Sequence, residues 1–239
     1  MMDINLLKPK TKMPETLEEK NDYVSRNFRD MMDRLSELYT RVDSEVPEYV
    51  TRRAERSERY RIEILDRATH DGLTGLYNAE TIKELGRKAV VDRRKKDSGV
   101  SFIYLDLDGF KEINDRYGHR AGDIVLRSMG RVLRENDGKP ARHGGDEFSV
   151  MLPGTDSDGA EVVKEKIRGS FRKAKSRWVR YLERKGVPEE DLDRIKNIGY
   201  SAGIASTEGG KSYDDLKSEA DGVMYMQKRG REKSPEKTN

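Results

Sequence analysis

Two adjacent glycines, Gly144 and Gly145, separate two short segments whose residues favour β-strands. The first segment is residues 141–143, and the second is residues 147–152. Both glycines can adopt positive φ, which other residues disfavour, so the pair predicts a tight hairpin between antiparallel strands. A chain that contains this hairpin has to place the residues around the two glycines at one edge of a β-sheet.

The segments around the hairpin alternate between β-prone and helical patterns. A short apolar run at residues 101–105 predicts a buried central strand. Apolar periodicity predicts a helix between this strand and the hairpin, and further elements after it. The predicted order is strand 101–105, helix 121–134, strand 141–143, strand 147–152, helix 159–185, strand 197–205 and helix 212–228. This order fits an α+β fold, a split βαβ or ferredoxin-like sheet with helices on one face.

Acidic residues lie at the ends of two of these strands. Asp106 and Asp108 follow the first strand, and Asp146 and Glu147 open the strand after the hairpin. The two strands are antiparallel neighbours in a split βαβ sheet, so these acids are expected about 5 Å apart across the sheet. Such carboxylates can share a hard cation such as Mg²⁺, and the glycine pair leaves room for a phosphate. The alternative is a set of solvated loop carboxylates.

A short helix is predicted directly after Asp108, starting at Gly109. The N–H groups of its first turn would suit phosphate oxygens, and Lys111 adds a positive charge. Asn114 and Asp123 carry an amide and a carboxylate of the kind that hydrogen-bond the edge of a guanine. Each of these signals is weak alone, but together with the acidic edge they indicate a nucleotide.

Composition excludes several other kinds of site. The 239 residues include no cysteine and three histidines, which removes disulfides, thiol catalysis and zinc–cysteine sites. Any metal is therefore expected on carboxylates. The 48 basic residues nearly balance the 45 acidic ones, which does not favour a nucleic-acid partner. No run approaches the roughly 20 apolar residues of a membrane span, and residues 1–4 do not resemble a signal peptide, so we expect a cytoplasmic protein with no membrane partner.

The N-terminal 70 residues contain no glycine and are predicted to be helical. Pro47 separates two helices, and the second runs from about residue 48 to residue 68. Apolar residues in the first helix follow heptad spacing, which predicts a coiled-coil homodimer; they are Val24, Phe28, Met31, Leu35, Leu38 and Val42. The alternative is a helical hairpin packed on the rest of the chain.

These features together resemble the GGDEF-domain diguanylate cyclases. The signature is intact in Arg142-His143-Gly144-Gly145-Asp146-Glu147-Phe148, and the resemblance covers about residues 70–231. Five other motifs support it in the family's order. They are residues 71–78 (DGLTGLYN), 106–115 (DLDGFKEIND), 118–123 (GHRAGD), 201–205 (SAGIA) and 220–225 (ADGVMY).

The resemblance implies an enzyme that condenses two GTP molecules into cyclic di-GMP, with loss of two pyrophosphates. Each protomer holds one GTP, so the reaction needs a homodimer with two sites face to face. The implied cofactor is Mg²⁺, with Mn²⁺ as the alternative. The implied ligands are Asp106, Asp146 and the carbonyl of Leu107, with Glu147 assisting at the metal.

The resemblance also assigns the remaining site residues. Asp146 or Glu147 would help to deprotonate the attacking 3′-hydroxyl, and the sequence does not choose between them. Asn114 and Asp123 would bind guanine, and His119 would lie near the nucleotide. The phosphates would be surrounded by Phe110, Lys111 and Lys228. This division agrees with phosphoryl transfer, which depends on alignment and charge neutralisation.

The sequence departs from the family pattern at several positions. The arginine expected after Asn78 is Ala79. Arg134 and Asp137 resemble the family's product-inhibition site, but six residues separate Asp137 from the glycine pair, one more than in the family. The alternative for this pair is a charged helix end. Arg231 follows Lys228 at a spacing of three rather than four, so its assignment to phosphate is weakened.

The segment between residues 171 and 195 is longer than in the family. Residues 171–185 carry seven basic residues and one acid, which would suit a nucleic acid or a partner protein, although a solvated helix extension is the favoured interpretation. Two rival functions remain for the whole domain. One is an inactive module that binds GTP or cyclic di-GMP, and the other is a relaxed cyclase that also makes mixed cyclic dinucleotides.

The chain is therefore expected to divide into three parts. Residues 1–69 form a helical dimerisation or regulatory segment, which could also bind a partner protein. Residues 70–231 form the catalytic domain, and residues 232–239 form a disordered tail. The sequence does not indicate the input signal.

Overall fold

A computed structural model describes residues 26, 29–34, 37, 48–96, 99–184, 186–196, 198–207 and 210–233. Contacts divide the chain into two compact units, Met1–Thr69 and His70–Asn239. In chain order the elements are α2 (Glu48–Thr69), β1 (Tyr77–Asn78), α3 (Ala79–Lys96), β2 (Val100–Leu107), α4 (Phe110–Tyr117), α5 (His119–Arg134), β3 (Lys139–Gly144), β4 (Glu147–Pro153), α6 (Ser157–Arg184), α7 (Glu189–Lys196), β5 (Tyr200–Ser206) and α8 (Tyr213–Lys233).

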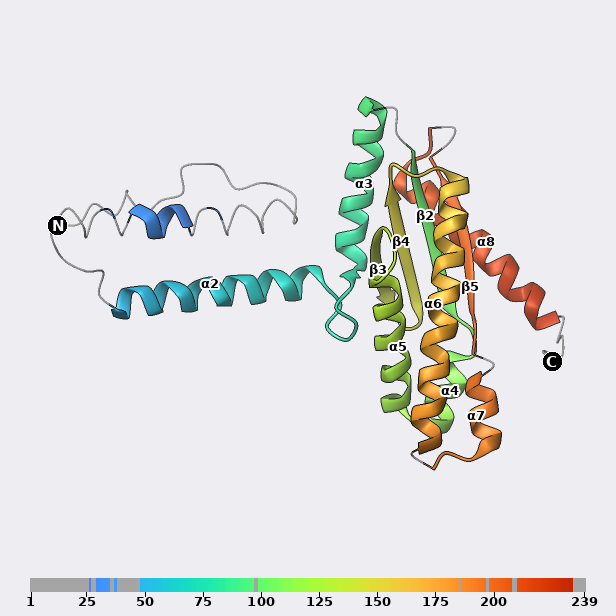
Figure 1. The fold of residues 1–239 in the computed structure, drawn as a ribbon. Helices are drawn as coiled ribbons and strands as arrows, with labels where there is room; N and C mark the ends of the chain where they lie inside the picture. Colours follow the sequence, from blue (N-terminus) through green and yellow to red (C-terminus); the bar gives the residue numbers. More distant parts are fainter. Residues whose placement is uncertain are drawn as a thin grey trace. The chain divides into compact units, whose positions relative to one another are not determined.

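The second unit is built on a five-stranded sheet with the order β1-β3-β4-β2-β5 (Figure 1). Strand β4 lies between β3 and β2 and is antiparallel to both, and β5 pairs antiparallel with the other edge of β2. The insertion of β4 between two strands that a helical crossover connects is the split βαβ arrangement. The predicted α+β fold class is confirmed.

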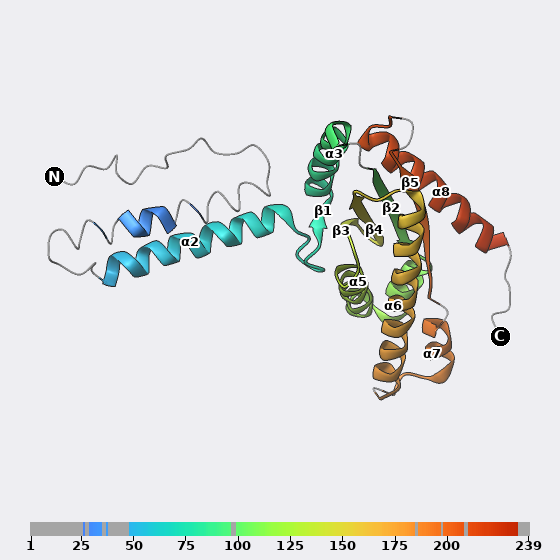
Figure 2. The same cartoon turned by 45° about the horizontal axis from the view of Figure 1, so that its top comes forward.

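Helices cover both faces of the sheet, not one face as the sequence analysis expected. Helices α5 and α6 lie on one face, and α3 and α8 lie on the other (Figure 2). Every residue of β2 is buried. Its alternating side chains enter two separate cores, with Ile103 and Leu105 in the first and Phe102 and Tyr104 in the second. A central strand that is apolar on both faces requires this double cover.

Several elements differ from the predictions in extent. Strand β2 is longer than residues 101–105 and includes Asp106, because both of its edges are paired. Helix α8 continues beyond residue 228 to Lys233. Helices α3 and α7 and the two-residue strand β1 were not predicted from the sequence. The predicted disordered tail overlaps the end of α8, and residues 234–239 lie outside the described residues.

The described part of the first unit is mainly α2. Ion pairs one turn apart line its exposed surface, such as Glu48 with Arg52 and Glu63 with Arg67, both at 2.6 Å. Most of the heptad positions predicted upstream lie outside the described residues, so the coiled coil stays a prediction. No helix in the described ranges is long and apolar enough to cross a membrane.

Helix α8 packs very closely on β5 at Gly203. A Cβ atom at this position would overlap the carbonyl oxygen of Ala220, a backbone atom that cannot turn aside. The same helix carries Lys228, which reaches the end of β2. The close approach at Gly203 therefore helps to set the position of α8, and of Lys228 with it.

Replacing Gly203 by alanine should destabilise the second unit, because the new methyl group would push α8 away from the sheet. Overpacking typically costs about 1–3 kcal/mol, and contact with backbone places this variant at the upper end. Thermal unfolding would measure the loss. Gly222→Ala is the matched control, since nothing lies within 4 Å of its added Cβ. An unfolding midpoint for Gly203→Ala equal to that of wild type would contradict the packing argument.

Candidate functional site

The strand register brings the predicted acids to one edge of the sheet. Asp106 is the Cα partner of Glu147 on β4 and of Ser201 on β5. The backbone N–H of Leu107 donates to the carbonyl oxygen of Asp146 at 3.2 Å, which holds the start of β4 beside the end of β2. Asp106, Leu107, Asp146 and Glu147 are thus neighbours, as the hairpin and the sheet order predicted.

Lys228 of α8 forms an ion pair with Asp106. Asp106 is only 7% exposed, and the burial of its carboxyl group raises the pKa of that group. The hydrogen bond from Lys228 acts in the opposite direction, but the negative charges of Asp146 and Asp108 raise the pKa further. By formal charge, the single ammonium group of Lys228 faces the three carboxylates of Asp106, Asp108 and Asp146 at this edge. Added positive charge at this edge would be stabilised.

Asp108 contacts the residues at the start of β5. Its Oδ1 accepts a hydrogen bond from the Ser201 hydroxyl at 2.8 Å, and its N–H donates to the carbonyl oxygen of Gly199 at 3.0 Å.

Among the described residues, no group of three or more Asp, Glu or His side chains is arranged so that it could hold a metal ion.

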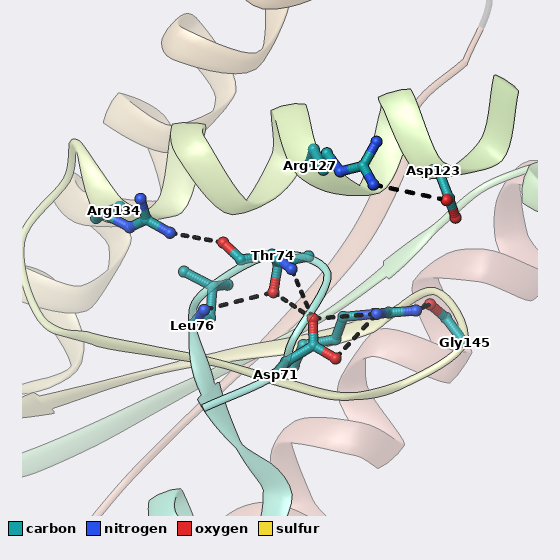
Figure 3. A network of polar contacts seen from close by, with 8 residues as sticks. Asp71, Thr74, Leu76, Asp123, Arg127, Arg134 and Gly145 are labelled. Atoms are coloured by element: carbon teal, nitrogen blue, oxygen red, sulfur yellow. Dashed lines mark hydrogen bonds and ion pairs between the residues drawn. The ribbon is translucent and has the colours of Figure 1, made fainter. Parts of the chain in front are cut away.

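Helices α4 and α5 bring Asn114 and Asp123 together. Gly109 precedes α4 with φ of 73°, and no side chain caps the first turn. The Asn114 amide lies against Gly122, and a Cβ at Gly122 would overlap its Oδ1. Asp123 follows Gly122 and lies 3.8 Å from Arg127 (Figure 3). The two predicted guanine-binding side chains therefore belong to one packed helix pair.

The other predicted substrate residues differ in exposure. Lys111 and His119 are exposed, and Lys228 is partly exposed. The side chain of Phe110 is instead buried in the core beside α5. Any contact of Phe110 with a phosphate would therefore come from its backbone. The side chain of Arg231 lies outside the described residues, so its assignment stays a prediction.

Arg142 braces the hairpin from the strand that precedes it. Its Nη1 donates to both carboxylate oxygens of Asp71 at 3.1 Å, and its Nη2 donates to the carbonyl oxygen of Gly145 at 2.8 Å. Asp71 also accepts hydrogen bonds from the N–H and hydroxyl of Thr74, at 2.8 and 2.6 Å (Figure 3). The contact between Asp71 and Arg142 was not predicted from the sequence. The available signal was the opposite charge of these two residues, which open the motifs at residues 71–78 and 142–148.

The pair that resembles an inhibitory site is engaged in contacts within the domain. Arg134 donates to the carbonyl oxygen of Thr74 at 2.6 Å (Figure 3). Asp137 forms an ion pair with Lys166 of α6 at 2.9 Å. Residues 171–184 of the basic segment form the end of α6, and Trp178 among them is buried in the core.

A second polar group missed by the sequence analysis lies beside Glu147. The hydroxyl of Tyr104, on β2, donates to Glu147 Oε2 at 3.1 Å. The ring of His143 lies 5.0 Å from the ring of Tyr104, and burial lowers the pKa of His143 to about 4, with Lys217 acting in the same direction. His143 is therefore neutral near pH 7. Its neighbour Ser149, at 2.9 Å, is fully buried.

Comparison with known proteins identifies the domain. The family profile described as "Diguanylate cyclase, GGDEF domain" matches residues 68–234. An uncharacterized membrane protein of Staphylococcus aureus (strain USA300) is 29% identical over 172 residues, which are 69% of this chain and 44% of the relative. The chain thus spans less than half the length of the curated relatives that it matches.

Solved structures support the same assignment. The coiled coil and GGDEF domain of DgcB from Caulobacter crescentus, in complex with c-di-GMP, has a TM-score of 0.62 at 26% identity, covering 81% of this chain and 95% of that one. The GGDEF domain of the same protein alone, also with c-di-GMP, has a TM-score of 0.56 at 28% identity, covering 68% and 89%.

The ion pair of Asp71 with Arg142 should make the free energy of unfolding depend on pH. Burial alone would raise the pKa of Asp71, but the hydrogen bonds from Thr74 and Arg142 outweigh burial and hold the pKa below its ordinary value. A lowered pKa contributes stability above the unfolded value, near 4, and the contribution is lost as pH falls through the lower folded value. Asp71→Asn should therefore cost about 1–2 kcal/mol at pH 7 and nothing at strongly acid pH.

Thermal unfolding of wild type and variant from pH 7 down to pH 2 would measure this difference. Asp214→Asn is the control, because its ion pair with Arg87 is exposed and should contribute little. A pH-independent cost of Asp71→Asn would show that the carboxylate charge is not what stabilises the hairpin.

Proposed function

Because this chain belongs to the GGDEF-domain family of diguanylate cyclases, we propose that it condenses two GTP molecules into cyclic di-GMP and releases two pyrophosphates. The observation that carries the proposal is the acidic edge of the sheet. The charges of Asp108 and Asp146 act on Asp106 there, and among the described residues Lys228 is the cation that pairs with Asp106. An edge with uncompensated negative charge is a place for a cation that accompanies a nucleotide triphosphate.

The residues at this edge fit a magnesium ion. Mg²⁺ prefers oxygen ligands and is usually held by one or two carboxylates together with substrate phosphates. Asp106 and Asp146 are the carboxylates we assign to it, with the carbonyl of Leu107, and Glu147 assists; Mn²⁺ has the same preference for oxygen. When bound, the ion would neutralise charge on the transferring phosphoryl group.

The nucleotide would extend from this edge to the helix pair. We assign the guanine to Asn114 and Asp123, and the triphosphate to Lys111, Lys228 and the uncapped first turn of α4. His119 precedes Asp123 by one helical turn and would lie near the nucleotide. Binding would draw Lys228 from Asp106 to the phosphates, which is an exchange of one anion for another. Asp146 or Glu147 would accept the proton of the attacking 3′-hydroxyl.

Formation of a cyclic dinucleotide needs two such sites, since each domain would hold one GTP. We therefore propose a homodimer in which residues 1–69 bring two catalytic domains together, and a partner protein could regulate that step. Arg134 and Asp137 are the residues we would assign to product inhibition. Product binding would then compete with their present contacts to Thr74 and Lys166. The cytoplasmic location expected from the sequence stays a prediction.

Two rival functions are separated from this proposal by one assay. Purified protein would be incubated with GTP, with ATP and with both, in the presence of Mg²⁺, and the products would be resolved by chromatography. We expect cyclic di-GMP from GTP. Mixed cyclic dinucleotides would indicate a relaxed cyclase, and nucleotide binding without any product at high protein concentration would indicate a regulatory module.

Asp146→Ala should abolish turnover and leave the fold intact, because the carboxylate is partly exposed at the hairpin and belongs to neither core. Product formation measures turnover, and thermal unfolding checks the fold. Asp158→Ala is the control, since Asp158 is an exposed acid in the first turn of α6. Retained activity in Asp146→Ala would refute the assignment of Asp146 to the metal.

Gly122→Ala should weaken GTP binding through Asn114. The added methyl group would displace the Asn114 amide, while the helix itself would gain from a better helix former. We expect the KM for GTP to rise about tenfold, which corresponds to about 1.4 kcal/mol, together with a lower unfolding midpoint, because the added Cβ would also lie 3.1 Å from Cζ of the buried Phe110 ring. Gly169→Ala is the control, because nothing lies within 4 Å of its added Cβ on α6. An unchanged KM for Gly122→Ala would remove Asn114 from the guanine site.

A further inference from the structure

The hydroxyl of Tyr104 reaches the acidic edge from inside the sheet. Tyr104 is 3% exposed and lies on the sheet face that α8 covers. It is the Cα partner of Ser149, and Asp106, two residues on, is the partner of Glu147. Diagonal neighbours across an antiparallel pair lie within reach of a long aromatic side chain. Tyr104 can therefore donate to Glu147 Oε2, at 3.1 Å.

This hydrogen bond restrains Glu147 at one oxygen only. Among the described residues, Tyr104 is the one side chain that donates to Glu147. A tyrosine hydroxyl is a hydrogen-bond donor near neutral pH. A donor that faces an ionised acceptor forms a stronger bond than a neutral pair does. Oε1 accepts no hydrogen bond from the described part of the chain.

The ring that carries the hydroxyl is itself fixed on several sides. His143 lies 5.0 Å from it, Phe102 lies 6.3 Å from it, and the ammonium of Lys217 lies 5.7 Å from the ring centre. His143 is held in turn by Ser149. The hydroxyl therefore has little freedom to move, and the Glu147 carboxylate that it binds is oriented before any substrate arrives.

We propose that Tyr104 is a positioning residue, which anchors one oxygen of Glu147 to the sheet and presents the other to the reacting nucleotide. This inference rests on the proposed function, because it gives Glu147 a part in the cyclase reaction. It names a residue outside the GGDEF signature on which turnover depends. The rival explanation is a buried tyrosine that only fills the core between β2 and α8.

Tyr104→Phe tests this inference, because it removes the hydroxyl and keeps the ring. We expect kcat to fall about tenfold or more, as is typical when the partner that orients a catalytic ligand is removed. The KM for GTP should change little, since Asn114 and Asp123 lie on α4 and α5. Tyr213→Phe is the matched control. Tyr213 is equally buried in the same core, and its hydroxyl has no hydrogen-bond partner among the described residues.

A stability cycle tests the contact independently of activity. Tyr104→Phe should lower the unfolding midpoint of wild type but not that of Glu147→Ala, in which the hydroxyl has already lost its acceptor. Equal shifts in both backgrounds would overturn the coupling. A lowered midpoint with wild-type kcat would overturn the positioning role and leave Tyr104 as a core residue. A wild-type chain that makes no cyclic dinucleotide would instead reject the proposed function, and the positioning role with it.

Discussion

The antiparallel pairing of β2 with β4 is the constraint on which the rest of the site depends. It sets Asp106 opposite Glu147 and lets Leu107 hold the backbone of Asp146. A shift of this register by one residue would turn Asp106 to the opposite face, away from Lys228. Every residue of β2 is buried, and its two sets of side chains fill different cores, so such a shift would disrupt both cores together. The packing of the domain therefore fixes the acidic edge.

Helix α8 links the stability of the fold to the charge balance of this edge. Its close approach to β5 at Gly203 permits Lys228 to reach Asp106. The ion pair is partly buried, and such a pair stabilises a structure only when its geometry and further hydrogen bonds offset desolvation. Here burial raises the pKa of Asp106 despite the lysine, and the charges of Asp146 and Asp108 act in the same direction. Under the proposed function, Lys228 would leave Asp106 for the phosphates when a cation binds at this edge.

The sequence predicted the local features that a short pattern determines. The glycine pair predicted the hairpin, and alternation of β-prone and helical segments predicted the split sheet, so the acids were correctly expected together. The sequence did not predict that helices cover both faces of the sheet, because α3 has few apolar residues and gave only a weak helical periodicity. It also missed the contacts of Arg142 with Asp71 and of Tyr104 with Glu147. These join residues far apart in the chain, which only the folded domain brings within hydrogen-bonding distance.

The two faces of β2 divide the proposed chemistry between them. Tyr104 and Asp106 point to the sheet face that α8 covers. There Tyr104 donates to Glu147, and Lys228 donates to Asp106. Phe110 and Ile113 of α4 pack into the opposite core, so Asn114 and Asp123 are held by the other layer of helices. Three residues, Leu107 to Gly109, join these layers, and the left-handed φ of Gly109 permits the chain to turn there. A nucleotide bound at both places would span the end of β2. Under the proposed function, the metal-binding edge would depend on the core that α8 covers, whereas guanine recognition and the first turn of α4 would depend on the opposite core, so substitutions in the α8 core should spare the recognition of guanine.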